Sequence, residues 1–216
     1  MKPELLILSM LMPLFLISTG TKAQSDEYTN AMMNTIQQLD QEEDPAGLLE
    51  LANRFERIAN AEKSRWIPYY YASYSLVVMS FIEEEGGKRD QVLDRAQELL
   101  DQALQLEPDE SELHVLQAFL YPSRIMVDPM GRGMTYIEKA FASLERAKTL
   151  NPKNPRIYFL EGVNRVNLPP SMGGGADAAK PILEEAMLKF ETEANPDPLW
   201  PHWGKEATQT ELEKLQ

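Results

Sequence analysis

Small and apolar residues recur with helical spacing along most of the chain. Ala96, Leu100 and Ala103 lie at offsets of 0, +4 and +7, and Pro108 follows at +12. The same offsets return twice further along, and the matching positions are Ala140, Leu144, Ala147 and Pro152, followed by Ala179, Leu183 and Ala186. Offsets of four and seven place residues on one stripe of a helix, and a later proline ends that helix. The pattern therefore predicts three helices that each pack closely through an alanine stripe.

A second set of apolar helices alternates with the first. Each of these is centred on a small residue, namely Ala72, Ala118 or Gly162. Ala103 precedes Ala118 by fifteen residues, and Ala147 precedes Gly162 by the same distance. The chain from about 65 to 191 is thus expected to repeat a pair of helices three times.

These helix pairs resemble the tetratricopeptide repeat (TPR), a helix-turn-helix unit of about 34 residues. The matches to its first helix are Tyr69, Ala72, Ala118, Tyr121, Tyr158 and Gly162, and those to its second helix are the alanine stripes above. The resemblance implies an all-α, right-handed helical-repeat solenoid of about three clear repeats with terminal capping helices. The alternative is an all-helical bundle in which the alanine spacing arises by chance.

The sequence departs from the family pattern by insertions between the two helices of each repeat. A standard unit has twelve residues between its two small positions, whereas this chain has 24, 22 and 17. The first insertion is expected to lengthen both helices, and the second and third, which are rich in proline and glycine, to form loops along one edge. Asp177 is the expected cap of the helix after the third insertion. The candidate binding residues on this loop edge are Arg124, Met130, Arg132, Met172, Gly173 and Gly174.

The ends of the chain divide into further segments. Residues 1–23 have the basic, apolar and small-residue parts of a cleavable signal peptide, and the alternative is an uncleaved amphipathic anchor. Residues 24–64 predict a helix pair that forms a cap or a degenerate repeat, and 65–191 hold the three repeats. Residues 192–216 predict an aromatic loop followed by a capping helix. We therefore expect a secreted or periplasmic protein without a lipid-bearing cysteine and without a membrane span in its mature chain.

Composition removes several classes of function. The chain of 216 residues has a formal net charge of −13, no cysteine and two histidines. The acid excess argues against nucleic acid as a partner, because phosphate binding needs a basic surface. Without cysteine and with few histidines, we expect no metal site, no catalytic residues and no cofactor. These features favour binding over catalysis, and a hydrolase with a carboxylate pair near the loops is a more remote alternative.

Two further groups of residues are candidates for the binding surface. In the TPR family the concave groove is lined by the first helix of each repeat. The groove candidates by this rule are Trp66, Tyr69, Ser73, Phe119, Arg156, Phe159, Val163 and Asn167. The aromatic patch near the C-terminus consists of Trp200, His202 and Trp203. This patch either recognises a ligand or seals the last repeat, and the groove is either open or filled by terminal segments.

Two hypotheses for function follow from the repeat. The first is an exported scaffold whose groove or loop edge engages a protein or peptide of the cell envelope. The second is a component that binds an apolar small molecule, distantly similar to the repeat proteins that accompany tripartite (TRAP-type) transporters. The first predicts an open groove, and the second predicts an apolar cavity within the repeats.

Overall fold

The fold is seen in a computed structural model that describes residues 20–195 and 197–215. Most of the expected signal peptide lies outside these residues. Within the described part every regular element is helical, and none of the helices combines the length and apolarity needed to cross a membrane. The elements are α1 Gly20–Leu39, α2 Pro45–Ala61, α3 Trp66–Ile82, α4 Gly86–Leu106, α5 Ser111–Val127, α6 Pro129–Leu150, α7 Pro155–Val166, η1 Pro170–Met172, α8 Ala176–Thr192 and α9 Lys205–Lys214.

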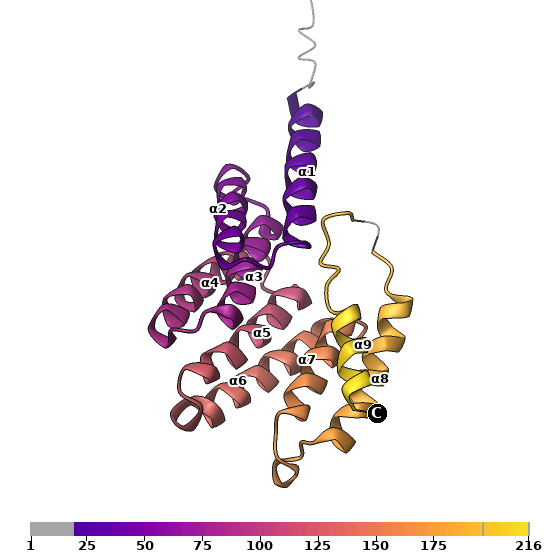
Figure 1. The fold of residues 1–216 in the computed structure, drawn as a ribbon. Coiled ribbons are helices and arrows are strands. Elements are labelled where there is room, and N and C mark those ends of the chain that lie inside the picture. Colours follow the sequence, from indigo (N-terminus) through magenta and orange to yellow (C-terminus); the bar gives the residue numbers. More distant parts are fainter. Residues whose placement is uncertain (1–19, 196, 216) are drawn as a thin grey trace, which may run out of the picture.

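Each helix packs on its neighbours in sequence, and the odd-numbered helices also contact one another. Thus α1 touches α3, α3 touches α5, and α5 touches α7. Figure 1 shows the successive helix pairs stacked one after another, with α9 lying against α8. This stacking of helix pairs is the arrangement of a helical-repeat protein, and it confirms the all-α, TPR-like fold expected from the sequence.

The alanine stripes lie where their spacing predicts. Ala96, Ala103, Ala140, Ala147, Ala179 and Ala186 are all fully buried. The stripe of Tyr28, Met32, Ile36 and Leu39 on α1 is buried as well. Close helix contact through small residues explains why a large share of the packing could be predicted from one offset pattern.

The second insertion is not a loop, which corrects the expectation from sequence. Helix α5 runs through Pro122 to Val127, and α6 begins at Pro129 after the single residue Asp128. The Asp128 carboxylate accepts a hydrogen bond from the backbone N–H of Gly131 at 3.0 Å, so it caps α6. Proline is well suited to the first turn of a helix, where its missing N–H has no partner to lose. The extra residues therefore lengthen both helices, as they do in α3 and α4.

The third insertion is a loop, as predicted. Residues 167–175 contain the short helix η1, and Gly173 and Gly175 adopt positive φ angles of 73° and 93°. Gly174 is buried against the backbone of Leu168, where no side chain has room. The expectation that Asp177 caps the next helix is wrong, because α8 begins one residue earlier and Gly175 precedes it without a side-chain cap. The glycines make this turn possible because they accept left-handed backbone angles.

Substitution by alanine is expected to have opposite effects on stability at two helical glycines, Gly162 and Gly133. A Cβ at Gly162 would lie 2.5 Å from the side chain of buried Leu183, whereas one at Gly133 would meet nothing within 4 Å. We expect Gly162→Ala to lower the free energy of unfolding by about 1–3 kcal/mol through overpacking. Gly133→Ala should raise it by about 0.5–1 kcal/mol, because alanine is the better helix former. Urea denaturation followed by circular dichroism measures both, and equal stabilities would contradict the close packing of α7 on α8.

Candidate ligand groove

A row of stacked aromatic rings runs along the side formed by α3 and α5. Tyr70 stacks on Tyr74, Tyr74 on Trp203, Trp203 on Phe119, and Phe119 on Phe81. The centroid distances along this row lie between 5.2 and 6.2 Å. Four of the rings belong to α3 and α5, but Trp203 comes from the segment between α8 and α9. The chain therefore places its own tryptophan within the groove that the repeat helices form.

The segment that carries Trp203 crosses back from the last repeat to the first helices, as Figure 1 shows. Trp200 packs edge-on against Trp66 at 5.6 Å, and the His202 imidazole lies 3.1 Å from the Asp40 carboxylate. The indole N–H of Trp203 donates to the Tyr70 hydroxyl at 2.7 Å. These contacts place the segment against the first helices, and Trp203 also packs on Phe119 of α5 and Phe159 of the last repeat.

The guanidinium of Arg156 fixes this segment by a hydrogen bond to its backbone. Its side chain is fully buried, and its Nε donates to both carboxylate oxygens of Glu112 at 3.0 Å. The Nη1 group donates to the backbone carbonyl of Trp203 at 3.2 Å, and the guanidinium also pairs with Glu193. Burial opposes the charge, but the fields of Glu112 and Glu193 outweigh it and raise the pKa of Arg156 above its usual range. Arg156 is therefore a charged anchor between α5, α7 and the C-terminal segment.

The first of two cavities, here called the central cavity, has a volume of 590 Å³. Its wall is mostly aromatic and apolar, and its mouth carries two carboxylates and one imidazole. The lining residues are Leu39, Asp40, Leu48, Tyr71, Tyr74, Val78, Phe119, Phe159, His202, Trp203, Gly204, Glu206 and Ala207. In the described part of the chain, the buried hydroxyl of Tyr71 has no hydrogen-bond partner. A ligand in this cavity would thus meet rings, carboxylates and one unpaired hydroxyl.

The second cavity, here called the methionine cleft, has a volume of 730 Å³. It lies between α3, α5, the start of α6, the end of α7 and the third insertion. Its lining residues are Phe81, Pro122, Ile125, Met126, Pro129, Met130, Gly133, Met134, Ile137, Asn164, Asn167, Leu168, Pro169 and Met172. No charged residue is among them. Phe81 belongs to this cleft and stacks on Phe119 of the central cavity, so the two cavities meet along the aromatic row.

Four methionines of the cleft are unusually exposed. Met126, Met130, Met134 and Met172 have exposed fractions of 45%, 97%, 56% and 40%, and few other large apolar residues of the described chain are as exposed. Exposed apolar patches of this kind mark binding surfaces, and flexible thioether side chains adapt to flat ligands. The side-chain nitrogen of Asn164 is buried in the same wall and has no hydrogen-bond partner among the described residues. Its donor capacity is therefore not used by any described residue.

The predicted groove residues separate into three groups. Phe119 and Phe159 line the central cavity, and Asn167 lines the methionine cleft. Trp66 contacts Trp200 of the C-terminal segment, and Val163 packs in the core around α7 and α8. Three others are buried away from both cavities. These are Arg156, Tyr69 and Ser73, whose hydroxyl donates to the Ala96 carbonyl of α4 at 2.8 Å.

The predicted loop-edge residues also separate. Met130 and Met172 line the methionine cleft, whereas Arg124 and Arg132 turn toward α4 and pair with Asp90 at 3.1 and 2.8 Å. Hydrogen bonds from Arg132 and Arg124 hold the pKa of Asp90 below its usual range. Gly173 accepts a hydrogen bond from Arg165 at 2.9 Å, and Gly174 is buried in the turn.

Several lining residues are missing from the sequence-based candidates. Tyr71 and Asn164 carry the two unpaired polar atoms, and Met126 and Met134 stand beside the predicted Met130. Met130 and Met134 are four residues apart on α6, which is helical spacing, whereas Met126 belongs to the last turn of α5. A loop prediction for the second insertion does not place these three side chains on one wall.

Together these features define a TPR-like helical-repeat protein with two cavities, one of which is lined in part by its own C-terminal segment. No protein-family model and no curated protein sequence matches the chain. Among solved structures, the HusA haemophore from Porphyromonas gingivalis is 30% identical, with a TM-score of 0.80 over 88% of this chain and 92% of that one. A thermophilic TPR protein of Thermus thermophilus is 17% identical, with a TM-score of 0.49 over 90% and 93% of the two chains. The chain belongs to the family of the HusA haemophore.

The buried guanidinium predicts a large effect of one substitution. Arg156→Met leaves the carboxylate of Glu112, which is 1% exposed, buried without its partner. We expect the free energy of unfolding to fall by about 3–5 kcal/mol. The double variant Arg156→Met/Glu112→Gln should recover part of that loss, because the fully buried charge is then gone and the Glu193 carboxylate, whose side chain is 25% exposed, can be solvated. Denaturation curves measure both, and a single variant as stable as the parent protein would show that the buried pair does not anchor the fold.

Proposed function

We propose that the protein is an exported binding protein for haem or a related porphyrin, and that the methionine cleft is its binding site. The family relationship supports the ligand class, since a haemophore is by its name a carrier of haem. The expected signal peptide supports export. Haem is cargo in this proposal, so it does not require a resident cofactor. The family relationship supports binding over catalysis as well.

The observation that carries the proposal is the lining of the cleft. A porphyrin is a flat, apolar ring with carboxylate-bearing side chains, and its faces need apolar contact on both sides. The cleft offers apolar walls from α5–α6 and from the third insertion, in a volume of 730 Å³ within the usual range for small-molecule sites. Its methionines suit the ring in two ways, because thioethers pack favourably against aromatic surfaces and also ligate haem iron in cytochromes c.

The polar group of the cleft matches the charge of the cargo. The unpaired Asn164 N–H is a donor, and the carboxylates of a porphyrin are acceptors. The central cavity is less suitable, because the carboxylates of Asp40 and Glu206 at its mouth would repel them. We therefore assign the porphyrin, which is apolar and carries carboxylates, to the methionine cleft, because no charged residue lines it.

The scaffold hypothesis has less structural support. A peptide in the concave groove would compete with Trp203, which already packs against both Tyr74 and Phe119. The alternative of a bound apolar small molecule fits the two cavities better. A partner protein that receives the cargo is compatible with this proposal, but no contact surface on the described residues identifies it.

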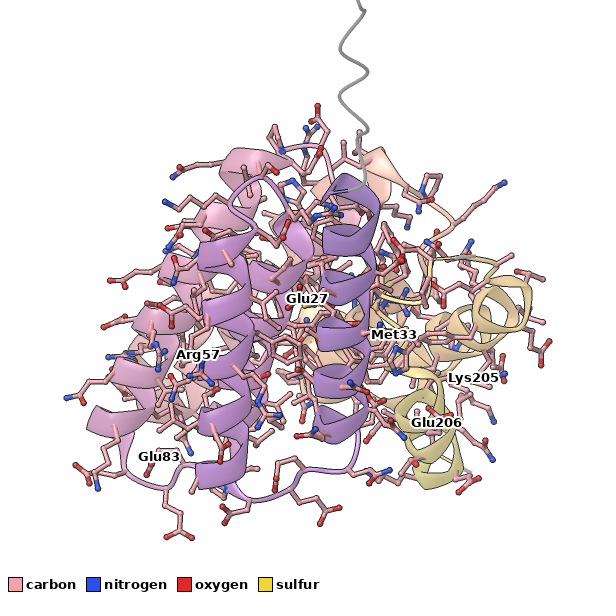
Figure 2. The ribbon with its side chains drawn as sticks, turned by 90° about the horizontal axis from the view of Figure 1, so that it is seen from above. Glu27, Met33, Arg57, Glu83, Lys205 and Glu206 are labelled. Carbon is pink, nitrogen blue, oxygen red and sulfur yellow. The ribbon has the colours of Figure 1, made fainter. Side chains whose placement is uncertain are left out.

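Charge placed on the wall of the cleft tests the proposal. We expect Met126→Glu/Met134→Glu to raise the Kd for haem at least about tenfold, because a bound ring would bury unpaired carboxylates. Met33→Glu/Leu188→Glu is the matched control, because it adds the same two charges at residues that are 44% and 64% exposed and do not line the cleft. Figure 2 shows Met33 on α1. Each protein is titrated with haem, and the change in the haem absorbance band gives the Kd. Equal affinity of the cleft variant and the parent would place haem elsewhere, and no binding by the parent would refute the function.

The unpaired amide of Asn164 predicts that a substitution there weakens haem binding without lowering the stability of the fold. Asn164→Leu removes the donor while it keeps a similar side-chain volume. We expect weaker haem binding by about threefold to tenfold, since one hydrogen bond is lost. The melting temperature should stay the same or rise, because the amide nitrogen has no partner in the described part of the protein. A variant that loses stability without losing affinity would assign Asn164 to the core instead.

A further inference from the structure

The central cavity has a chemistry opposite to that of the methionine cleft. Its mouth carries the carboxylates of Asp40 and Glu206, and His202 is the one basic group among its lining residues. Asp40 directly follows the last residue of α1, and Glu206 lies in the first turn of α9. Figure 2 shows Glu206 on α9, and Glu206 lines the same cavity as Leu39 at the end of α1. The cavity thus opens between two acidic side chains from opposite ends of the chain.

Aromatic rings form the wall behind these carboxylates. Tyr74 stacks on Trp203 at 5.3 Å, Trp203 stacks on Phe119 at 5.4 Å, and Phe159 meets Trp203 edge-on at 6.2 Å. All four rings line the cavity. Ring faces carry partial negative charge and attract cations, with gains of about 0.5–2 kcal/mol per favourable contact. Rings and carboxylates together therefore favour a positively charged ligand that also has an apolar body.

The unpaired hydroxyl of Tyr71 supplies an independent sign of a ligand. Tyr71 is 2% exposed, lines the cavity, and has no hydrogen-bond partner for its hydroxyl among the described residues. Burial raises the pKa of Tyr71, and the field of Asp40 raises it further, so the phenol stays neutral. The same carboxylate raises the pKa of Tyr74, after burial. The negative field of Asp40 therefore reaches the floor of the cavity, where a neutral oxygen can accept an N–H.

The nearest buried cation does not cancel this field. Arg156 lies behind Trp203, and its charge is matched by Glu112 and Glu193. Lys205 is adjacent to Glu206 in sequence but is exposed and does not line the cavity. A ligand cation would thus meet carboxylates at the mouth and aromatic faces along the wall.

We propose that the central cavity binds a small organic amine with an apolar or aromatic body, separately from the porphyrin site. The protonated amine would lie beside Glu206 and share the Asp40 carboxylate with the His202 imidazole, which is 3.1 Å from it, with an N–H toward Tyr71. The body would pack against Tyr74, Phe119 and Trp203. This site does not depend on haem binding, so either proposal can fail alone.

Three probes that share one ring system test the ligand class. Tryptamine is the cation, tryptophol the neutral analogue and indole-3-propionate the anion. We expect tryptamine to bind at least about tenfold more tightly than the other two, measured by calorimetry on the full mature protein. The side-chain N–H resonance of Trp203 in NMR spectra, assigned with Trp203→Phe, should shift on binding. Equal affinity for all three probes, or no binding of tryptamine, would overturn the proposal.

Variants of the same protein locate the site. Glu206→Gln should weaken tryptamine binding several-fold, and Tyr71→Phe should weaken it without lowering stability. Glu213→Gln is the control, because it removes the same charge from α9 at a residue that does not line the cavity. Haem affinity should be unchanged in all three variants. An equal loss in Glu206→Gln and Glu213→Gln would mean that the general negative charge attracts the amine, and would overturn the assigned site.

Discussion

The structure depends on one buried charge. Arg156 is enclosed between α5, α7 and the C-terminal segment, and it can remain charged there only because Glu112 and Glu193 compensate it. The same guanidinium binds the carbonyl of Trp203, so the ion pair that joins two repeats also fixes the tryptophan in the groove. Glu112 in turn accepts a hydrogen bond at 2.8 Å from Asn154, the residue that caps α7. One hydrogen-bond network thus fixes the start of α7, the contact between α5 and α7, and the position of Trp203.

The stacked rings of Phe81 and Phe119 separate two cavities with different chemistry, and Trp203 lines only the first of them. On one side lie carboxylates, rings and an unpaired hydroxyl, and on the other lie thioethers, aliphatic groups and an unpaired amide nitrogen. A buried donor or acceptor without a partner costs free energy, so each one needs an explanation, and an absent ligand is one such explanation. The proposals for the two cavities therefore depend on the Tyr71 hydroxyl and the Asn164 amide nitrogen.

The repeat could be predicted from the sequence because close helix contact needs small residues at fixed offsets, and Ala96, Ala140 and Ala179 meet that need locally. The α5–α6 junction could not, because Pro122 and Pro129 resemble loop residues until the helix around them is known. The residues that line the groove are even more difficult to predict from the sequence. Arg156 and Ser73 occupy positions that face the groove in a simple repeat, but here a distant segment or a neighbouring helix covers them. Their roles depend on contacts far apart in sequence, which local patterns do not contain.

The returning C-terminal segment also affects how the chain folds. Repeat proteins usually have contacts only between neighbours, so their folding can begin in any repeat and spread. Here His202 reaches Asp40 across 162 residues, and Trp203 reaches Tyr70 across 133. Such distant contacts raise the contact order and require closure of a long loop before they gain energy. The segment thus links the two ends of the array, so the groove is completed only after the last repeat has formed, and the array behaves more like one cooperative unit than a row of modules.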